Sequence, residues 1–380
     1  MLKDLLTAAP PVLAVAERFA AEEMAPNAAA WERERRYPRD AFARAAAAGL
    51  CGLFVPREAG GLDISCQERI ALWEVMARAD FGFTFSLVVH TAFAAAIARN
   101  GSAAQRDRYV PAMMSGDCLG AFLLTEKQSG SDAAGILTRA VQDGADWRID
   151  GAKTWVTNAA SADLLHVYAQ TDPEAGWRGI AAFLVQADDP GVIREEPYFM
   201  LGGHSMGVGG FRFDGAKVPA DRMLFPPGEG FKAALGGITI ARIVVPAMCA
   251  GMLQAAVDQA TAALTGRRAF GRDLADFQGL QWRLADVATD LHAIRCMAAD
   301  AARRVDAGED AQIAAAHVKK FAPARALEGL AACMQMMGAD GLKQDNPLPR
   351  HLAAAKLAQY MDGSSEIQNR VLARHLLGRG

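Results

Sequence analysis

The spacing of apolar residues divides the chain into three stretches. In the first, up to about residue 115, apolar side chains recur three and four positions apart, as at Leu72, Val75, Met76 and Ala79. This period places them on one face of a helix, so the first stretch predicts helices. The same spacing returns after about residue 230, where it predicts long helices at about 233–266, 274–304, 309–338 and 365–377.

The middle stretch, from about residue 118 to about residue 224, has a different pattern. Its apolar segments are short or alternate with polar residues, which predicts strands at 166–169, 180–185 and 211–214. Three Asp-Gly pairs predict hairpin turns, at Asp143-Gly144, Asp150-Gly151 and Asp214-Gly215. Helices, then strands, then long helices make an α+β arrangement. We expect an N-terminal helical domain at 1–117, a central β domain at 118–226 and a C-terminal helical bundle at 227–380.

Composition and charge narrow the functions open to the chain. With 380 residues, 52% of them hydrophobic, the chain can bury a large core. Its net charge of −3, without a basic block, argues against nucleic-acid binding. The longest uninterrupted apolar run, at 243–253, is too short to cross a bilayer, so we expect no membrane span.

Targeting and metal-binding patterns are not evident in the sequence. The first residues include Asp4, Pro10 and Pro11, where a signal peptide needs an apolar stretch. The six cysteines are scattered without a C-x-x-C pair, which favours free thiols in a reducing cytosol. The seven histidines show no H-x-x-x-H spacing. We therefore expect a cytoplasmic protein without a bound metal.

Two motifs in the middle stretch carry the strongest chemical signal. The first is FLLTEKQSGSD at 122–132, and the second is KTWVTN at 153–158. In this order and at this spacing they resemble the flavin-contacting strands of the acyl-CoA dehydrogenase family. The resemblance covers almost the whole chain and implies FAD as cofactor, a barrel-like central β domain and a C-terminal four-helix bundle. The glycines at 202–210 precede strand-like sequence, which disfavours a Rossmann site.

The resemblance assigns roles to residues of these two motifs. Alternate backbone groups of a strand face one side, which suits contacts along the edge of a flavin ring. Gly130-Ser131 suits a phosphate, because glycine lets the backbone approach and the hydroxyl and N–H groups donate. In the family pattern the indole of Trp155 lies beside the isoalloxazine, and the hydroxyl of Thr157 bonds near N5. Lys127 and Ser129 stand where proline and alanine are usual. The cofactor-binding residues implied by these motifs are Phe122, Leu124, Thr125, Gly130, Ser131, Trp155 and Thr157.

Two motifs in the last stretch resemble family elements that reach FAD across a subunit interface. RRAFG at 267–271, followed by Gln278, resembles R-x-x-F-G-x-x-x-x-x-x-Q. QMMGADG at 335–341 resembles Q-x-x-G-G-x-G, with Ala339 in place of the second glycine. Because such residues serve a neighbouring subunit's FAD, the resemblance implies a homodimer or homotetramer. The residues that it assigns to this role are Arg267, Phe270, Gln278, Gln335 and Gly338.

The motif YMDGSSEIQ at 360–368 decides the chemistry. It resembles the family's Y-E-G-T-S-Q-I-Q, so Asp362 falls where the catalytic glutamate normally sits. Some members instead carry the base just before the arginine that aligns with Arg242, and Ala241 occupies that place here. The resemblance also assigns Ser364 and Glu366 to the cofactor. It assigns to the substrate Ser131, Thr239, Arg242 and Gly363.

The reaction that the resemblance implies is α,β-dehydrogenation of an acyl thioester, carried by CoA or by an acyl-carrier protein. In the family a carboxylate removes the α-proton while the β-hydride moves to flavin N5, and the electrons pass to an acceptor such as an electron-transfer flavoprotein. Two alternatives stay open. One is another flavin enzyme on the same fold, such as a nitroalkane-oxidase-like enzyme or a monooxygenase. The other is a non-catalytic partner subunit that completes a neighbour's FAD site.

Overall fold

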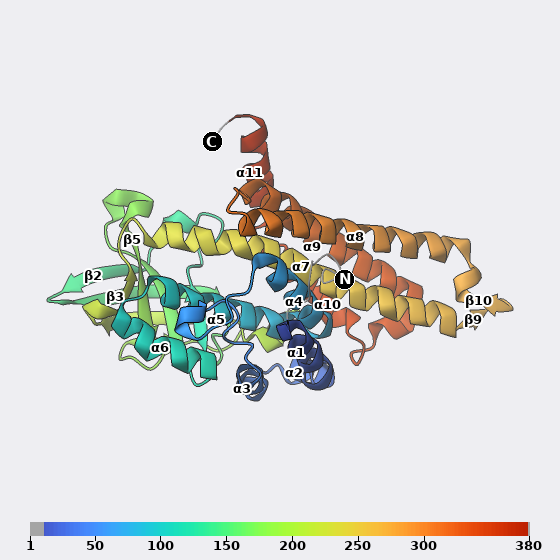
Figure 1. Cartoon of the computed structure of the whole chain (residues 1–380), viewed down its shortest axis with the longest axis horizontal. Helices are drawn as coiled ribbons and strands as arrows, with labels where there is room; N and C mark the ends of the chain where they lie inside the picture. Colours follow the sequence, from blue (N-terminus) through green and yellow to red (C-terminus); the bar gives the residue numbers. More distant parts are fainter. Residues whose placement is uncertain (1–10, 379–380) are drawn as a thin grey trace.

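The computed structural model describes residues 11–378 as an elongated molecule (Figure 1). The strands of the central sheet lie at one end, the N-terminal helices pack beside them and near the middle, and long helices extend to the opposite end, where the small hairpin of β9 and β10 lies. This order of elements confirms the predicted α+β arrangement of helices, strands and long helices.

Three of the described N-terminal helices, α4, α5 and α6, begin at residues whose side chains cap them. Ser65 and Glu68 form a capping box at the start of α4 (Cys66–Ala79), which satisfies backbone N–H groups that the helix leaves free. Asp80 caps α5 (Phe81–Asn100) in the same way. The other N-terminal helices are α1 (Pro11–Phe19), the π-helical turn η2 (Ala20–Met24), α2 (Ala28–Glu34), α3 (Arg39–Ala47) and α6 (Ala103–Ser115).

The central sheet has eight strands. Their order is β6-β7-β3-β2-β4-β5-β8, and β1 pairs in parallel with β4. The predicted strands at 166–169, 180–185 and 211–214 lie within β4, β5 and β7, which confirms them. The bounds are β1 (Gly120–Leu123), β2 (Arg139–Asp143), β3 (Asp146–Val156), β4 (Leu164–Gln170), β5 (Ile180–Gln186), β6 (Val192–Arg194), β7 (Gly209–Val218) and β8 (Met223–Phe225).

Only one of the three Asp-Gly pairs forms the predicted hairpin turn. Asp143-Gly144 joins β2 to β3, whereas Asp150-Gly151 lies inside β3 and Asp214-Gly215 inside β7. These two pairs lie near each other on the paired strands, where the register shifts between Ile149 and Gly151. Gly215 N donates to Asp150 Oδ1 at 2.7 Å. The glycines supply the positive φ of an irregular strand pair, so the prediction of turns there was wrong.

The C-terminal helices α7, α8, α9 and α10 pack on one another, and α11 projects from the loop after α10 (Figure 1). The four helices predicted from spacing match α7, α8, α9 and α11 within a few residues. The spacing did not predict α10, which begins directly after Pro347 and carries Pro349 in its first turn. Proline is accommodated in the first turn of a helix, where its missing N–H has no partner to lose. The bounds are α7 (Gly230–Gly266), β9 (Arg268–Ala269), β10 (Arg272–Asp273), α8 (Gln278–Asp306), α9 (Gln312–Met337), α10 (Leu348–Ala358) and α11 (Ser365–Leu376).

Two described helices, α5 and α7, are long and apolar enough to cross a membrane by length and composition. Their most apolar windows are 83% and 56% buried inside the protein, respectively. α5 packs against α4 and α6, and α7 packs against α4, α8 and α9. Burial in the core therefore accounts for the apolar composition of both helices.

Candidate active site

Asp362 lies in the loop between α10 and α11. Its backbone is left-handed, with a φ of 54°, and Gly363 follows with a φ of 91°, so the chain turns sharply there. Asp362 Oδ2 is buried and has no hydrogen-bond partner among residues 11–378. Burial raises the pKa of the Asp362 carboxyl from 3.8 to about 6, against the opposing effect of the nearby cations Lys319 and Arg242. The loop thus carries a carboxylate whose oxygen is free to accept a proton.

Two cationic side chains hold this loop through its backbone carbonyls. Arg242 Nε, on α7, donates to Asp362 O at 2.9 Å. Lys319 Nζ, on α9, donates to Ala358 O at 2.8 Å and to Gly363 O at 3.4 Å. The structure therefore brings Arg242 and Gly363, both assigned to the substrate, together with Asp362.

Lys319 belongs to none of the sequence motifs, although its side chain is wholly buried. The available signal was its place on the helix. Lys319 comes four residues after Ala315 and three before Ala322, two residues of the buried face of α9. A charged residue at an apolar position of an amphipathic helix is one that needs a partner inside the protein.

A buried ion pair joins the two middle motifs. Lys153 Nζ, on β3, lies 2.7 Å from Glu126 Oε1 and donates to Leu124 O at 2.9 Å. Thr125 O also accepts from Thr154 N at 3.0 Å. These contacts fix the segment after β1 against β3, so Leu124 and Thr125 lie beside the second motif.

Phe122 lies on β1, partly buried, with its ring packed against a hydrophobic core cluster. The ring packs against His166 and Tyr168, with centroids 5.7 and 5.0 Å away. A role of Phe122 in binding a cofactor would therefore rest on its backbone.

Trp155 and Thr157 lie where β3 ends. Trp155 has a left-handed φ of 57°, and its side chain is 59% exposed, with the ring edge-on to Tyr198 at 5.1 Å. Thr157 is buried. The next residue, Asn158, ties the end of β3 to β1, because its Nδ2 donates to Gly120 O at 2.9 Å. The end of β3 thus presents an open indole face on a rigid support.

Gly130 and Ser131 lie in an exposed turn after β1. A side chain at Gly130 would meet no atom within 4 Å, so there is open space beside the backbone. Ser129 Oγ donates to Asp132 O and closes the turn on itself. The turn leaves Gly130 and the Ser131 hydroxyl accessible to a ligand.

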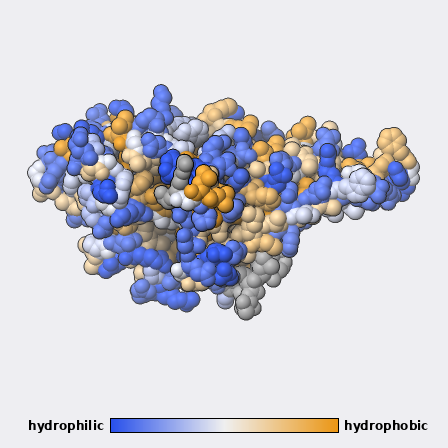
Figure 2. Space-filling view, turned by 90° about the horizontal axis from the view of Figure 1, so that it is seen from above, coloured by the Kyte–Doolittle hydropathy of each residue, from blue (hydrophilic) through white to orange (hydrophobic). Residues whose placement is uncertain are grey.

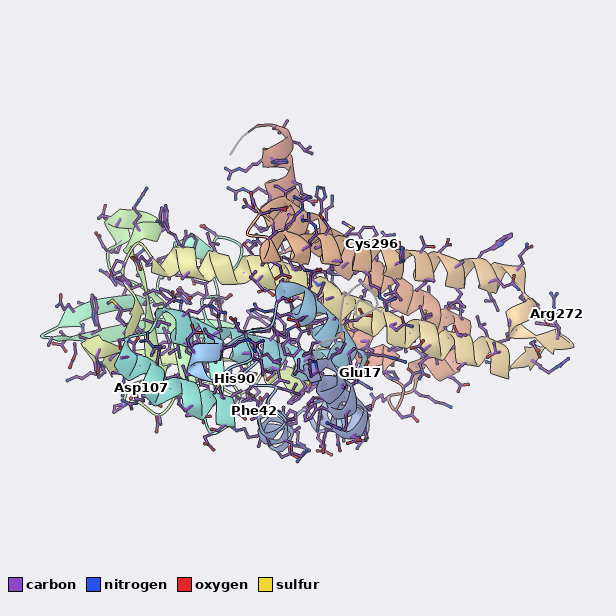
Figure 3. The ribbon with its side chains drawn as sticks, viewed as in Figure 1. Glu17, Phe42, His90, Asp107, Arg272 and Cys296 are labelled. Atoms are coloured by element: carbon purple, nitrogen blue, oxygen red, sulfur yellow. The ribbon has the colours of Figure 1, made fainter. Side chains whose placement is uncertain are left out.

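The residues assigned to a neighbouring FAD gather at the far end of the helical bundle. Arg267 ends α7, and its Nη1 lies 3.4 Å from the position that a side chain at Gly338 would occupy. Phe270 is 94% exposed and contacts Phe277 edge-on, just before Gln278. Gln335 is exposed in the last turn of α9. Figure 1 shows this end, marked by β9 and β10, opposite the end that holds the sheet, and Arg272 of β10 marks it in Figure 3.

The other assigned residues lie around the Asp362 loop and on α7. Thr239 Oγ1 donates to Leu235 O of its own helix at 3.0 Å. Ser364 precedes α11, and a hydrogen bond from its side chain lowers the pKa of Glu366, which is exposed. Across residues 11–378 there is no group of three or more His, Cys, Asp or Glu side chains arranged to hold a metal ion.

Comparison with protein families covers nearly all of the chain. Residues 12–117, 121–216 and 228–377 match the N-terminal, middle and C-terminal domains of acyl-CoA dehydrogenase. A probable acyl-CoA dehydrogenase of Mycobacterium tuberculosis is 33% identical over 360 residues, which cover 94% of this chain and 92% of the relative.

Solved structures agree with these matches. Butyryl-CoA dehydrogenase from Megasphaera elsdenii has a TM-score of 0.92 at 29% identity, over 96% of this chain and 97% of that one. A glutaryl-CoA dehydrogenase from Mycobacterium smegmatis in complex with FADH2 has a TM-score of 0.91 at 26% identity, over 97% of this chain and 94% of that one.

Proposed function

Because the chain belongs to the acyl-CoA dehydrogenase family and is a flavin oxidoreductase with FAD as cofactor, we propose that Asp362 is the base that removes the α-proton of the acyl-CoA. The observation that carries this proposal is the buried Oδ2 of Asp362, which has no hydrogen-bond partner among the described residues. An oxygen in this state can accept a proton without first giving up another hydrogen bond.

The surroundings of Asp362 suit a base that works near neutral pH. With a pKa of about 6, the carboxyl is ionised at pH 7 and is still a stronger base than an ordinary aspartate. The α-proton of a thioester is weakly acidic, so the carbonyl has to be polarised as the proton leaves. The backbone N–H of Asp362 would be a donor for that carbonyl, and the left-handed backbone at Asp362 and Gly363 makes the sharp turn that holds it in the loop.

FAD fits the residues at the end of β3 and in the turn after β1. Trp155 offers an exposed aromatic face, Thr157 a hydroxyl beside it, and Gly130-Ser131 an open loop for a phosphate. Backbone groups of Phe122, Leu124 and Thr125 would complete the ring contacts. When bound, FAD supplies the acceptor for the hydride that leaves the β-carbon of the substrate.

The enzyme acts as an oligomer in which two subunits share each FAD. Arg267, Phe270 and Gln278 flank β9 and β10, which lie at the end of the molecule opposite the sheet (Figure 1), and Gln335 and Gly338 join them at the end of α9, where Gly338 lies beside Arg267. One cofactor cannot reach both ends within one protomer, so this end serves a partner. Apolar surface along the helical end supports this, since Phe270, Trp282 and Leu342 are 94%, 62% and 70% exposed. Figure 2 shows apolar side chains over this part of the molecule, including its tip.

The family supports CoA as the carrier of the acyl group, with an acyl-carrier protein as the second form of the thioester to test. An electron-transfer flavoprotein is the proposed electron acceptor, and the cytoplasm the proposed location.

Anaerobic mixing with acyl thioesters tests this function. Wild-type protein should lose flavin absorbance without oxygen when mixed with a suitable acyl-CoA from a series of graded chain lengths, and the same acyl groups on a carrier protein reveal the preferred carrier. Asp362→Asn should keep FAD and bind the thioester, but reduce the flavin about 10² to 10⁴ times more slowly. The matched control is Asp345→Asn, because Asp345 is an exposed aspartate in the turn before α10.

Two outcomes would overturn the proposal. Wild-type reduction rates in Asp362→Asn would place the base elsewhere. Substrate conversion only with NAD(P)H and oxygen would favour a monooxygenase on the same fold.

A further inference from the structure

Lys319 carries a buried positive charge. Its side chain is 0% exposed, and among residues 11–378 the hydrogen bonds of its Nζ go to backbone carbonyls and not to a carboxylate. Burying an ammonium is unfavourable unless hydrogen bonds compensate for lost water. Here the compensation comes from two backbone carbonyls, Ala358 O and Gly363 O.

These two carbonyls bracket the residue that we propose as the base. Ala358 is the last residue of α10, where free carbonyls favour a nearby cation. Gly363 directly follows Asp362. Lys319 therefore ties the end of α10 to the residue after the base, and the chain between them has to make the left-handed turn at Asp362.

Other bonds at the loop share this task without replacing Lys319. Arg242 Nε donates to the backbone carbonyl of Asp362, and Gln368 Nε2 donates to Gly363 O at 2.9 Å. Neither of these side chains bonds Ala358 O among the described contacts. Lys319 is thus the side chain that connects both ends of the loop.

The charges around the loop come from three elements. Lys319 of α9 and Arg242 of α7 both favour the ionised form of Asp362, while burial opposes it. Cys249 and Arg242 of α7 are also near enough to act on Lys319; burial lowers the pKa of the Lys319 ammonium, while Asp362 raises it. Because Lys319 bonds carbonyls rather than the carboxylate, its charge acts on Asp362 without occupying Oδ2.

We propose that Lys319 is a positioning residue of the reaction: through its hydrogen bonds to Ala358 O and Gly363 O it holds the loop 358–363 so that Asp362 meets the substrate with Oδ2 unoccupied. This inference rests on the proposed role of Asp362 as the base.

The test compares Lys319→Met, Lys319→Gln and Lys319→Arg in the FAD-loaded full chain. Lys320→Met is the matched control, since Lys320 is the next residue and is exposed. For each variant we would measure FAD content, thermal unfolding, and the limiting rate of anaerobic flavin reduction by an acyl-CoA as a function of pH.

The two neutral variants should keep FAD and reduce it about 10- to 100-fold more slowly, because a small displacement of a base has an effect of this size. The acid limb of their pH profiles should move toward higher pH, since the cation that favours the carboxylate is gone. Lys319→Arg should return that limb to the wild-type position, and Lys320→Met should change neither rate nor limb.

A folded neutral variant with wild-type rate and acid limb would overturn the inference. If neither neutral variant folds with FAD, Lys319 serves folding alone and the inference is likewise overturned. The two proposals can fail separately. If Asp362→Asn reduces flavin at the wild-type rate, Asp362 is not the base and both proposals fail. If Asp362→Asn is slow but the Lys319 variants behave like the wild type, only the positioning role of Lys319 is overturned.

Discussion

The ammonium of Lys153 lies 2.7 Å from Oε1 of Glu126, and their side chains are 0% and 4% exposed. Glu126 also accepts from Leu137 N and Thr138 N, at 2.7 and 3.0 Å. Burial lowers the pKa of Lys153 to about 8, even though Glu126 opposes this shift. The pair joins the two motifs that we assign to FAD, so the shape of that site depends on it.

We expect Lys153→Met and Glu126→Gln each to reduce the free energy of unfolding by about 3 kcal/mol, because each leaves one buried charge without its partner. The double variant should lose less than the sum of the two, since the interaction can be lost only once. Chemical denaturation of the apo proteins measures all three. Lys127→Met, an exposed lysine next to Glu126, is the control and should change stability by less than about 0.5 kcal/mol. Additive losses in the double variant would show that the two side chains act independently.

Asp362→Asn should stabilise the protein, and more so at higher pH. The carboxyl has its folded pKa raised from 3.8 to about 6, so the stability it contributes is full below pH 3.8 and is lost as pH rises through 6. Asparagine stays neutral and avoids this loss, which amounts to about 3 kcal/mol at pH 8 and about half of that at pH 5. Thermal unfolding of both proteins without substrate, at pH 5 and pH 8, checks the sign. A stability gain that is the same at both pH values would contradict a raised pKa.

The helical and strand periodicity of the sequence predicted most of the fold, because periodicity reports which side chains face the core. It did not predict α10, which has one proline at its N-cap and another in its first turn, nor the positions of Asp150-Gly151 and Asp214-Gly215 inside paired strands. Both errors have the same origin. Proline and glycine favour particular backbone conformations, and the same conformation can occur in a turn, at a helix start or in an irregular strand pair. The tertiary context decides which of these forms.

The sequence predicted which motifs form the candidate site, but not how their side chains and backbone are arranged within it. Glu126 and Lys153 are 27 positions apart in the sequence, and nothing between them indicates that their side chains meet inside the protein. The left-handed backbone at Trp155 and Asp362 is equally hidden, since neither residue is a glycine. Lys319 was not predicted because its hydrogen-bond partners are backbone carbonyl groups, which every residue has and which therefore leave no pattern in the sequence.

Arg267→Ala should weaken FAD retention without unfolding the protomer. Arg267 is exposed at the far end of the bundle, so its loss should change protomer stability by less than about 0.5 kcal/mol. The ratio of flavin to protein absorbance after gel filtration measures retention, and light scattering gives the oligomeric state. Arg268→Ala, the adjacent exposed arginine that bonds Gly271 O, is the control and should keep FAD. A monomer with normal FAD affinity would contradict a site shared between subunits.

Asp362→Glu should slow flavin reduction and yet keep a titrating base. The side chain is longer by one methylene, which moves the carboxylate by roughly 1 Å, and a displacement of that size lowers a rate by up to about 10²-fold. Glutamate also tolerates the left-handed backbone at φ 54° less well than aspartate does. Stopped-flow reduction across pH should therefore show a lower plateau with an acid limb still present, whereas Asp362→Asn should lose the limb together with the rate. If Asp362→Glu matched the wild-type plateau, the loop would have to move freely, and the hydrogen bonds from Arg242 and Lys319 to its carbonyls would not be what positions the base.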